Sequence, residues 1–165
     1  MIVLVLGGAR SGKSAVAERQ AADLAGGTAV TYLATAASGA DADLDARISR
    51  HRDRRPADWT TVEEADDLAG ALLETVGVAL VDGLGPWLAS KPLLVADIDG
   101  LCAALVARTG DTVVVSDEVG LGVHPSTEVG RRFRDALGLA NQAVAARADR
   151  VLLVVAGCVL SLKPA

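Results

Sequence analysis

The sequence predicts an α/β fold with a mostly parallel, open sheet and helices on both faces. Short runs rich in Val, Leu and Ile alternate with stretches in which apolar residues recur at helical spacing. Runs that are apolar at every position are typical of strands buried on both faces of a parallel sheet. Strands that alternate with helices favour a sheet covered by helices on both sides.

Length and composition favour one domain over residues 1–165. Of the 165 residues, 51% are hydrophobic and 22% are charged, which is typical of a globular chain rather than a disordered one. The net charge of −5 argues against nucleic acid as a partner, because contacts to phosphates need a basic surface. Two Trp, one Tyr and one Phe are too few to form a stacking platform for single-stranded bases.

The individual elements follow from the same pattern. The apolar runs expected to be strands are residues 2–6, 29–33, 77–81, 112–115 and 151–155. The stretches expected to be helices are residues 14–24, 41–52, 63–75, 98–108 and 127–146. After Gly157, residues 159–162 predict a strand that turns back as an antiparallel C-terminal edge strand.

Signals for export or membrane insertion are not found in the sequence. The apolar residues after Met1 lack the basic segment of a signal peptide. The longest apolar stretch, residues 151–160, is about half as long as a spanning helix needs to be. Cys102 and Cys158 form no CxxC motif, which argues against a zinc ribbon or a redox pair. We therefore expect a cytoplasmic protein without a membrane span.

Residues 7–14 form a phosphate-binding motif. Their sequence, GGARSGKS, fits GxxxxGK[ST], and an apolar run precedes it while a helical pattern follows. In such a loop the backbone N–H groups point at phosphate oxygens. We expect Lys13 to reach the β- and γ-phosphates and the Ser14 hydroxyl to bind Mg²⁺. The fold is then of the P-loop NTPase type; the alternative is a glycine-rich turn without a ligand.

Acidic residues follow two of the expected strands. Asp82 ends the run at 78–82, at the edge of the sheet where ligands bind in open α/β folds, and we expect it to help bind Mg²⁺. The alternative is that Asp82 only begins a turn. Asp117 and Glu118 end the fourth run, where one of them activates a water or hydroxyl, or both cap the loop.

A cluster of arginines surrounds His51 in an otherwise acidic chain. At helical spacing Arg47, Arg50 and Arg54 share one face with His51. Neighbouring guanidinium groups favour a neutral imidazole, which can attack an activated phosphorus while the arginines bind the other phosphates. The alternative is a solvated cationic helix. His124, in a turn before Pro125, is expected to be structural or peripheral to the site.

These residues occur in the order of a known family. The ordered set consists of GGARSGKS at 7–14, YLATA at 32–36, Arg47-Ile48 followed by His51, RPADW at 55–59, EVGLG at 118–122, RFRD at 132–135 and Asn141-Gln142. Over nearly the whole chain it resembles the bifunctional adenosylcobinamide kinase and adenosylcobinamide-phosphate guanylyltransferase of cobalamin biosynthesis.

The resemblance implies two reactions in one enzyme. ATP or GTP phosphorylates adenosylcobinamide, and GMP then passes from GTP, through a guanylylated His51, to adenosylcobinamide phosphate. It further implies a P-loop α/β domain that can assemble as a homotrimer. The nucleotide-binding residues that it implies are Gly7, Gly8, Ala9, Arg10, Ser11, Gly12, Lys13, Ser14, Ala34, Thr35, Ala36, Arg52, Asp53, Arg54, Arg55, Glu63 and Asp82.

The sequence departs from the family pattern in three places. Residues 82–87 keep Asp82 and Trp87 but lack the Cys and Thr common between them, and the segment after Trp87 is short. Asp117 stands where Asn is common.

Two other functions are alternatives: a different P-loop kinase of small molecules, and a regulatory protein that binds GTP as a switch. A covalent adduct of GMP with the enzyme would distinguish the expected function from both.

Overall fold

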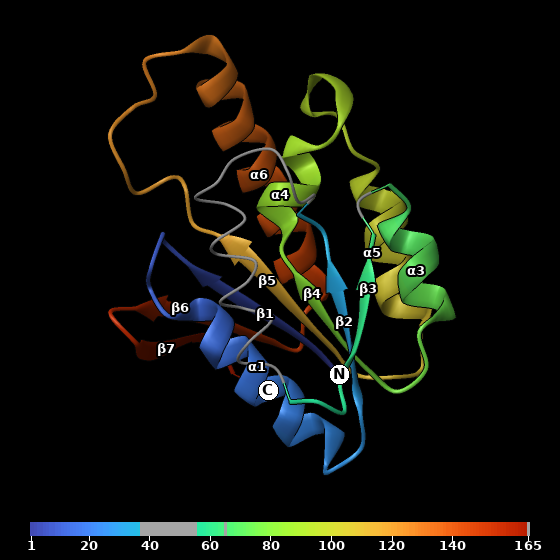
Figure 1. Cartoon of the computed structure of the whole chain (residues 1–165). Coiled ribbons are helices and arrows are strands. Elements are labelled where there is room, and N and C mark those ends of the chain that lie inside the picture. The colour runs from blue at the N-terminus through green and yellow to red at the C-terminus, as the bar shows by residue number, and fades with distance from the viewer. Residues whose placement is uncertain (37–55, 65, 165) are drawn as a thin grey trace.

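The computed structural model describes residues 1–36, 56–64 and 66–164, and their strands form one seven-stranded sheet (Figure 1). The strands are β1 (Ile2–Gly7), β2 (Val30–Ala34), β3 (Thr60–Glu63), β4 (Val78–Asp82), β5 (Thr112–Asp117), β6 (Arg150–Val155) and β7 (Cys158–Lys163). The helices of the described residues are α1 (Lys13–Ala25), α3 (Leu68–Glu74), α4 (Leu84–Ala89), α5 (Ile98–Ala107) and α6 (Glu128–Arg147), with a 3₁₀ turn η1 (Pro92–Leu94).

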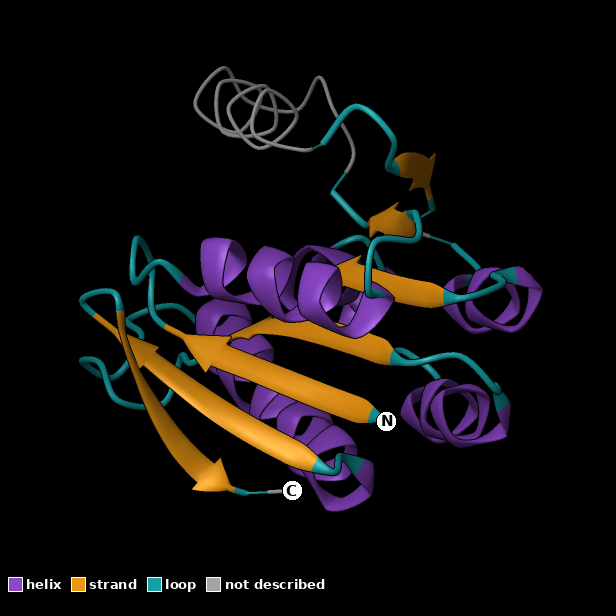
Figure 2. Ribbon diagram, turned by 90° about the horizontal axis from the view of Figure 1, so that it is seen from below, coloured by secondary structure: helices purple, strands orange, loops and turns teal. Residues whose placement is uncertain are grey.

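The strand order is β3-β2-β4-β5-β1-β6-β7, and all neighbours are parallel except β6 and β7. This confirms the mostly parallel sheet and the antiparallel strand at its C-terminal edge. Figure 2 shows β7 at one edge of the sheet, ending beside the C-terminus. In the parallel part, all carboxyl ends meet at one edge, so the loops after β1, β2, β4 and β5 gather there.

Helices cover both faces of the sheet, as expected. Successive side chains of a strand point to opposite faces. Val3 and Val5 of β1 pack in one apolar cluster with Val16, Ala17 and Ala21 of α1. Leu4 and Leu6 belong to the cluster on the other face, which the helices after β3 cover; its helical members include Leu72, Leu88, Leu105 and Leu137.

The prediction of a helix over residues 63–75 is wrong for the start of that segment. Residues 60–63 form strand β3, and α3 begins only at Leu68. The β-branched run of Thr60, Thr61 and Val62 favours a strand. The Asp67 side chain then accepts a hydrogen bond from Gly70 N at 2.8 Å and fixes the start of the helix.

Helix α4 was not expected from the sequence. It holds Gly85 and Pro86, which have low helix propensity, but it buries Leu84, Trp87 and Leu88 against the sheet. Burial of these large side chains outweighs local preference. The helix expected at 41–52 lies outside the described residues. No helix in the described ranges is long and apolar enough to span a membrane.

Candidate active site

The phosphate loop joins the end of β1 to the start of α1, and its glycines are required by its shape. A Cβ on Gly7 would collide with Ser11 Oγ and would lie 2.8 Å from the Val154 carbonyl oxygen. Gly12, at the N-terminus of α1, has φ of 92°, a value that residues with a side chain rarely adopt. A larger residue at either position would force the loop out of this conformation.

Neighbouring segments hold the loop in place. Ser11 N donates to Gly8 O at 3.2 Å within the loop. From outside, Glu118 N donates to Gly7 O at 3.1 Å, and Gly157 N, in the turn between β6 and β7, donates to Ser11 O at 2.8 Å. The loop is therefore fastened on both sides, by the segment after β5 and by the C-terminal hairpin.

Lys13 lies between the loop and an acid on the next strand. Its Nζ donates to Gly8 O at 3.3 Å and forms an ion pair with Asp117 Oδ1 at 2.6 Å. The register places Asp117 directly beside Gly7, so the pair follows from the strand order. Because the side chain of Lys13 is only 15% exposed, the interaction is poorly screened by solvent.

Asp117 and Glu118, which the sequence offered either as an activating acid or as loop caps, have different contacts in the structure. Glu118 Oε1 accepts from Gly120 N at 2.6 Å, so its side chain caps the following turn. Asp117 pairs with Lys13, and its carbonyl oxygen accepts from Asn141 Nδ2 at 3.1 Å. Residue type and position in the sequence did not show that Asp117 faces the lysine, because this depends on β5 lying next to β1.

Asp82 lies one strand further from the loop. It pairs in register with Val115 of β5, two residues before Asp117, and its Oδ2 accepts a hydrogen bond from the Tyr32 hydroxyl. By the alternation along β4, Asp82 shares the α1 face of the sheet with Leu80. Asp117 shares that face with Val113 and Val115. Both acids therefore lie on the side of the sheet from which α1 presents Lys13 and Ser14.

Thr35 fixes the backbone next to Asp82. Its side chain is fully buried; Oγ1 donates to Gly83 O at 2.7 Å and accepts from Gly83 N at 2.9 Å. Thr35 N also donates to Asp82 O at 3.3 Å. The Thr35 hydroxyl is thus turned inward, where it connects the segment after β2 to the segment after β4.

Three of the residues implied by the family resemblance form a row across the sheet. Glu63 of β3 is in register with Ala34 of β2, and Ala34 is in register with Asp82 of β4. The sequence separates these residues widely, but the strand pairing brings them to one level of the carboxyl edge. Ala36 is half-buried just beyond this row.

The oxygen ligands at this edge suit Mg²⁺. The Ser14 hydroxyl and the Asp82 and Asp117 carboxylates are hard donors, and Mg²⁺ is commonly held by one or two carboxylates together with substrate phosphates. In the ranges that the structure describes, no three acidic, His or Cys side chains converge on a metal centre. This donor set fits a metal that enters with a nucleotide better than one held by protein alone.

Seven predicted residues lie outside the described residues: Arg47, Arg50, His51, Arg52, Asp53, Arg54 and Arg55. Two contributors were missed by the sequence analysis. Tyr32 donates to Asp82, and Gly157 holds Ser11 from the far end of the chain. The motif YLATA includes Tyr32 without showing which way it points, and nothing in the sequence links residue 157 to the loop.

The fold is shared with a solved structure of low sequence identity. The flagellar accessory protein FlaH from Methanocaldococcus jannaschii superposes with a TM-score of 0.55 and 15% identity, covering 99% of this chain and 78% of that one. At this identity the likeness concerns the fold alone.

Sequence comparisons identify the family. The chain is 46% identical to the bifunctional adenosylcobalamin biosynthesis protein CobP of Pseudomonas aeruginosa, over 97% of this chain and 96% of the relative. It is 36% identical to the bifunctional adenosylcobalamin biosynthesis protein CobU of Escherichia coli, over 99% of this chain and the whole relative. A family model matches residues 3–162. The chain therefore belongs to the cobinamide kinase / cobinamide phosphate guanyltransferase family.

Proposed function

We propose that this chain phosphorylates adenosylcobinamide and then transfers GMP to the product, using one phosphate loop for both nucleotide donors. The observation that carries the proposal is the position of Lys13. Its ammonium group lies at the loop, on the face of the sheet that also carries Asp82 and Asp117. A cation and two acids around a phosphate loop suit transfer from a nucleoside triphosphate. Membership of the family supports the choice of acceptor.

In the kinase reaction, the acceptor hydroxyl oxygen attacks the γ-phosphorus of ATP or GTP. The bond from that phosphorus to the β-bridging oxygen breaks, the nucleoside diphosphate leaves, and the hydroxyl proton passes to an acid at the sheet edge or to water. Lys13 stabilises the charge that develops on the β- and γ-oxygens. Bound by Ser14 and Asp82, Mg²⁺ would supply neutralisation of the phosphate charge.

In the guanylyl transfer, an imidazole nitrogen of His51 attacks the α-phosphorus of GTP. The bond to the α,β-bridging oxygen breaks and pyrophosphate leaves, so a phosphorus–nitrogen bond holds GMP on the enzyme. A phosphate oxygen of adenosylcobinamide phosphate then attacks the same phosphorus. The phosphorus–nitrogen bond breaks, His51 is regenerated, and adenosylcobinamide-GDP is the product. The row of Glu63, Ala34 and Asp82 supports a nucleotide on this side of the loop.

Labelled GTP and two variants test the proposal. With α-labelled GTP we expect label that survives denaturation, is lost in acid and persists in base, as a phosphoramidate should. His51→Ala abolishes this adduct and the formation of adenosylcobinamide-GDP, while ATP still phosphorylates adenosylcobinamide. Lys13→Ala slows both reactions by about a hundredfold, since a preorganised charge of this kind contributes on the order of 3 kcal/mol. An adduct that persists in His51→Ala would contradict the assignment.

The metal and the assembly are separate parts of the proposal. Asp82→Asn keeps the shape of the side chain but removes its charge, so we expect both reactions to need more Mg²⁺. A Mg²⁺ titration that overlays the wild type would contradict the metal role. The family resemblance implies a homotrimer, and sedimentation equilibrium tests it.

A further inference from the structure

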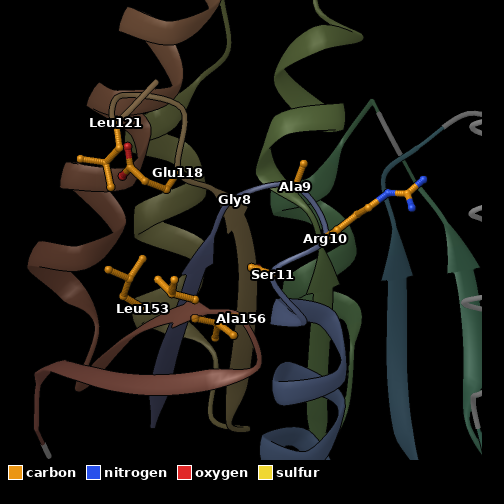
Figure 3. A pocket seen from close by; sticks show the side chains of 10 residues that line it. Gly8, Ala9, Arg10, Ser11, Glu118, Leu121, Leu153 and Ala156 are labelled. Atoms are coloured by element: carbon orange, nitrogen blue, oxygen red, sulfur yellow. The ribbon is translucent and has the colours of Figure 1, made fainter. Parts of the chain in front are cut away.

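A pocket of about 320 Å³ lies beside the phosphate loop, between the loop and the end of β6. The loop backbone at 8–11 forms one wall. The opposite wall is mostly apolar and consists of Leu121 together with residues 153–156, and Glu118 also lines the pocket (Figure 3). Figure 3 shows Arg10 pointing away from Leu121 and Leu153, so its charged group does not enter this space.

This pocket is on the opposite side of the loop from the row of Glu63, Ala34 and Asp82. The loop continues β1, which lies between β5 and β6 in the sheet. The row belongs to β3, β2 and β4, beyond β5. The pocket is lined by the end of β6 and by Glu118 and Leu121 from the segment after β5, and Figure 3 shows these side chains on the side of the loop away from which Arg10 points. A nucleotide with its phosphates in the loop can therefore place its base on either side, but not on both at once.

The walls of the pocket suit a ligand with an anionic part and a flat apolar part. The loop provides N–H groups for phosphate oxygens, and the volume is in the range of pockets that hold small organic ligands. Leu121 is 82% exposed and Val155 is 59% exposed, so the ligand-free protein leaves large apolar side chains in water beside a phosphate site. Burial of these side chains against the faces of a purine ring would be favourable.

We propose that this pocket holds the base and ribose of the nucleotide that donates the γ-phosphoryl group, while the GTP that donates GMP places its base on the β2–β4 side. The inference rests on the proposed function, because it needs the loop to bind the phosphates of both donors. The two reactions attack different phosphorus atoms, γ in one and α in the other. Two base positions around one loop present each atom to its own nucleophile without a second phosphate site.

Photolabelling locates the base directly. The probes are 8-azido-ATP and 8-azido-GTP, each irradiated with the full-length protein and Mg²⁺, and the labelled residues are found by peptide mass spectrometry. We expect 8-azido-ATP to label residues 118–121 or 153–156. We expect 8-azido-GTP, under conditions that form the GMP adduct, to label residues 34–36 or 60–64. Labelling of the β2–β3 residues by both probes would overturn the proposal.

A variant provides a second, independent measurement. Leu121→Ala removes an exposed apolar side chain from the pocket, and Leu139→Ala, on α6 and 66% exposed, is the matched control. We expect Leu121→Ala to raise the KM for ATP in the kinase reaction several-fold, with the rate of GMP adduct formation unchanged and with no effect of Leu139→Ala. Equal effects of Leu121→Ala on both reactions, or no effect on either, would overturn the proposal. If the proposed function itself fails, the wild type forms neither product, so the two failures are distinguishable.

Discussion

Lys13 Nζ and Asp117 Oδ1 lie 2.6 Å apart, so the cation of the phosphate loop already has a carboxylate partner. A nucleotide that binds at the phosphate loop must compete with the Asp117 carboxylate for Lys13. It must also bring its own negative charge close to that carboxylate, which is unfavourable. A divalent cation that enters with the phosphates would relieve this repulsion. An Asn at this position would impose no such competition, because its side chain carries no charge.

Asp117→Asn is therefore expected to bind GTP more tightly when Mg²⁺ is removed. The substitution removes the ion pair of Lys13 and a negative charge beside the phosphates. We expect the Kd for GTP to fall about tenfold, or roughly 1.4 kcal/mol. Isothermal titration with excess EDTA measures it. Asp111→Asn is the control, because Asp111 is also ion-paired and has the same 34% side-chain exposure, but lies at the other end of β5. Equal affinities of Asp117→Asn and wild type would contradict the prediction.

Gly7→Ala is expected to destabilise the protein. The added Cβ would meet Ser11 Oγ and the backbone carbonyl of Val154. The Val154 backbone cannot shift to make room without disturbing the pairing of β6 with β1. We expect a loss of about 2 kcal/mol in the free energy of unfolding, measured by urea denaturation. Gly8→Ala is the matched control, since a Cβ there meets nothing within 4 Å. If both variants unfold at the same urea concentration, the close approach at Gly7 does not matter for stability.

Among the arginines in the described ranges, the half-buried Arg108 is expected to contribute most to stability. Its guanidinium donates to the carbonyl oxygens of Leu72, Thr75, Gly77, Gly110 and Asp111 and to Thr112 Oγ1. Partial burial lowers the pKa of this guanidinium, which still stays protonated. Arg108→Ala leaves several carbonyls without a donor and should lower the free energy of unfolding by about 3 kcal/mol.

Arg147→Ala provides the comparison for Arg108. Arg147 Nη1 donates to Ala143 O within the same helix, and its side chain is exposed. We expect a change within about 0.5 kcal/mol for this variant. Thermal denaturation of both variants measures the difference, and equal midpoints would show that the bonds of Arg108 add nothing to stability.

The two cysteines should differ strongly in reactivity. Burial raises the pKa of the Cys102 thiol, so less of the reactive thiolate is present at a given pH, whereas Cys158 is exposed. Iodoacetamide at pH 8 should modify Cys158 in the native protein and leave Cys102 intact until the chain unfolds. Peptide mass spectrometry reads the sites. Modification of Cys158→Ser at the wild-type rate would show that Cys102 is the accessible thiol after all.

Much of the fold could be predicted because the spacing of apolar residues along the chain indicates which faces of strands and helices are buried. The five apolar runs became β1, β2, β4, β5 and β6, and the stripe on α6 was visible in the sequence. Strand β3 and helix α4 were missed because their local signals are weak: β3 is short and exposed, and α4 contains Gly85 and Pro86. Both are stabilised by contacts that the local sequence does not encode.

The candidate site was predictable in its residue types and less so in its geometry. The motif at 7–14 marked the phosphate loop, and the sequence singled out Asp82 and Asp117. Which of the two acids faces Lys13 depends on strand order, and β5 lies between β1 and β4. The sequence also did not show that the Thr35 hydroxyl bonds to the backbone of Gly83. Motifs in the sequence show which residues have suitable side chains for the chemistry. The pairing of the strands decides which of these side chains lie close together.

The position of β1 has a consequence for synthesis of the protein. Both of its neighbours, β5 and β6, belong to the second half of the chain, and the loop that follows β1 is fastened by Gly157. During translation, β1 therefore has neither partner strand until most of the chain has been made. Unpaired apolar strands of this kind favour aggregation and are what chaperones protect. The nascent chain is thus expected to depend on chaperones, and its phosphate loop gains its final shape only when the C-terminal hairpin folds.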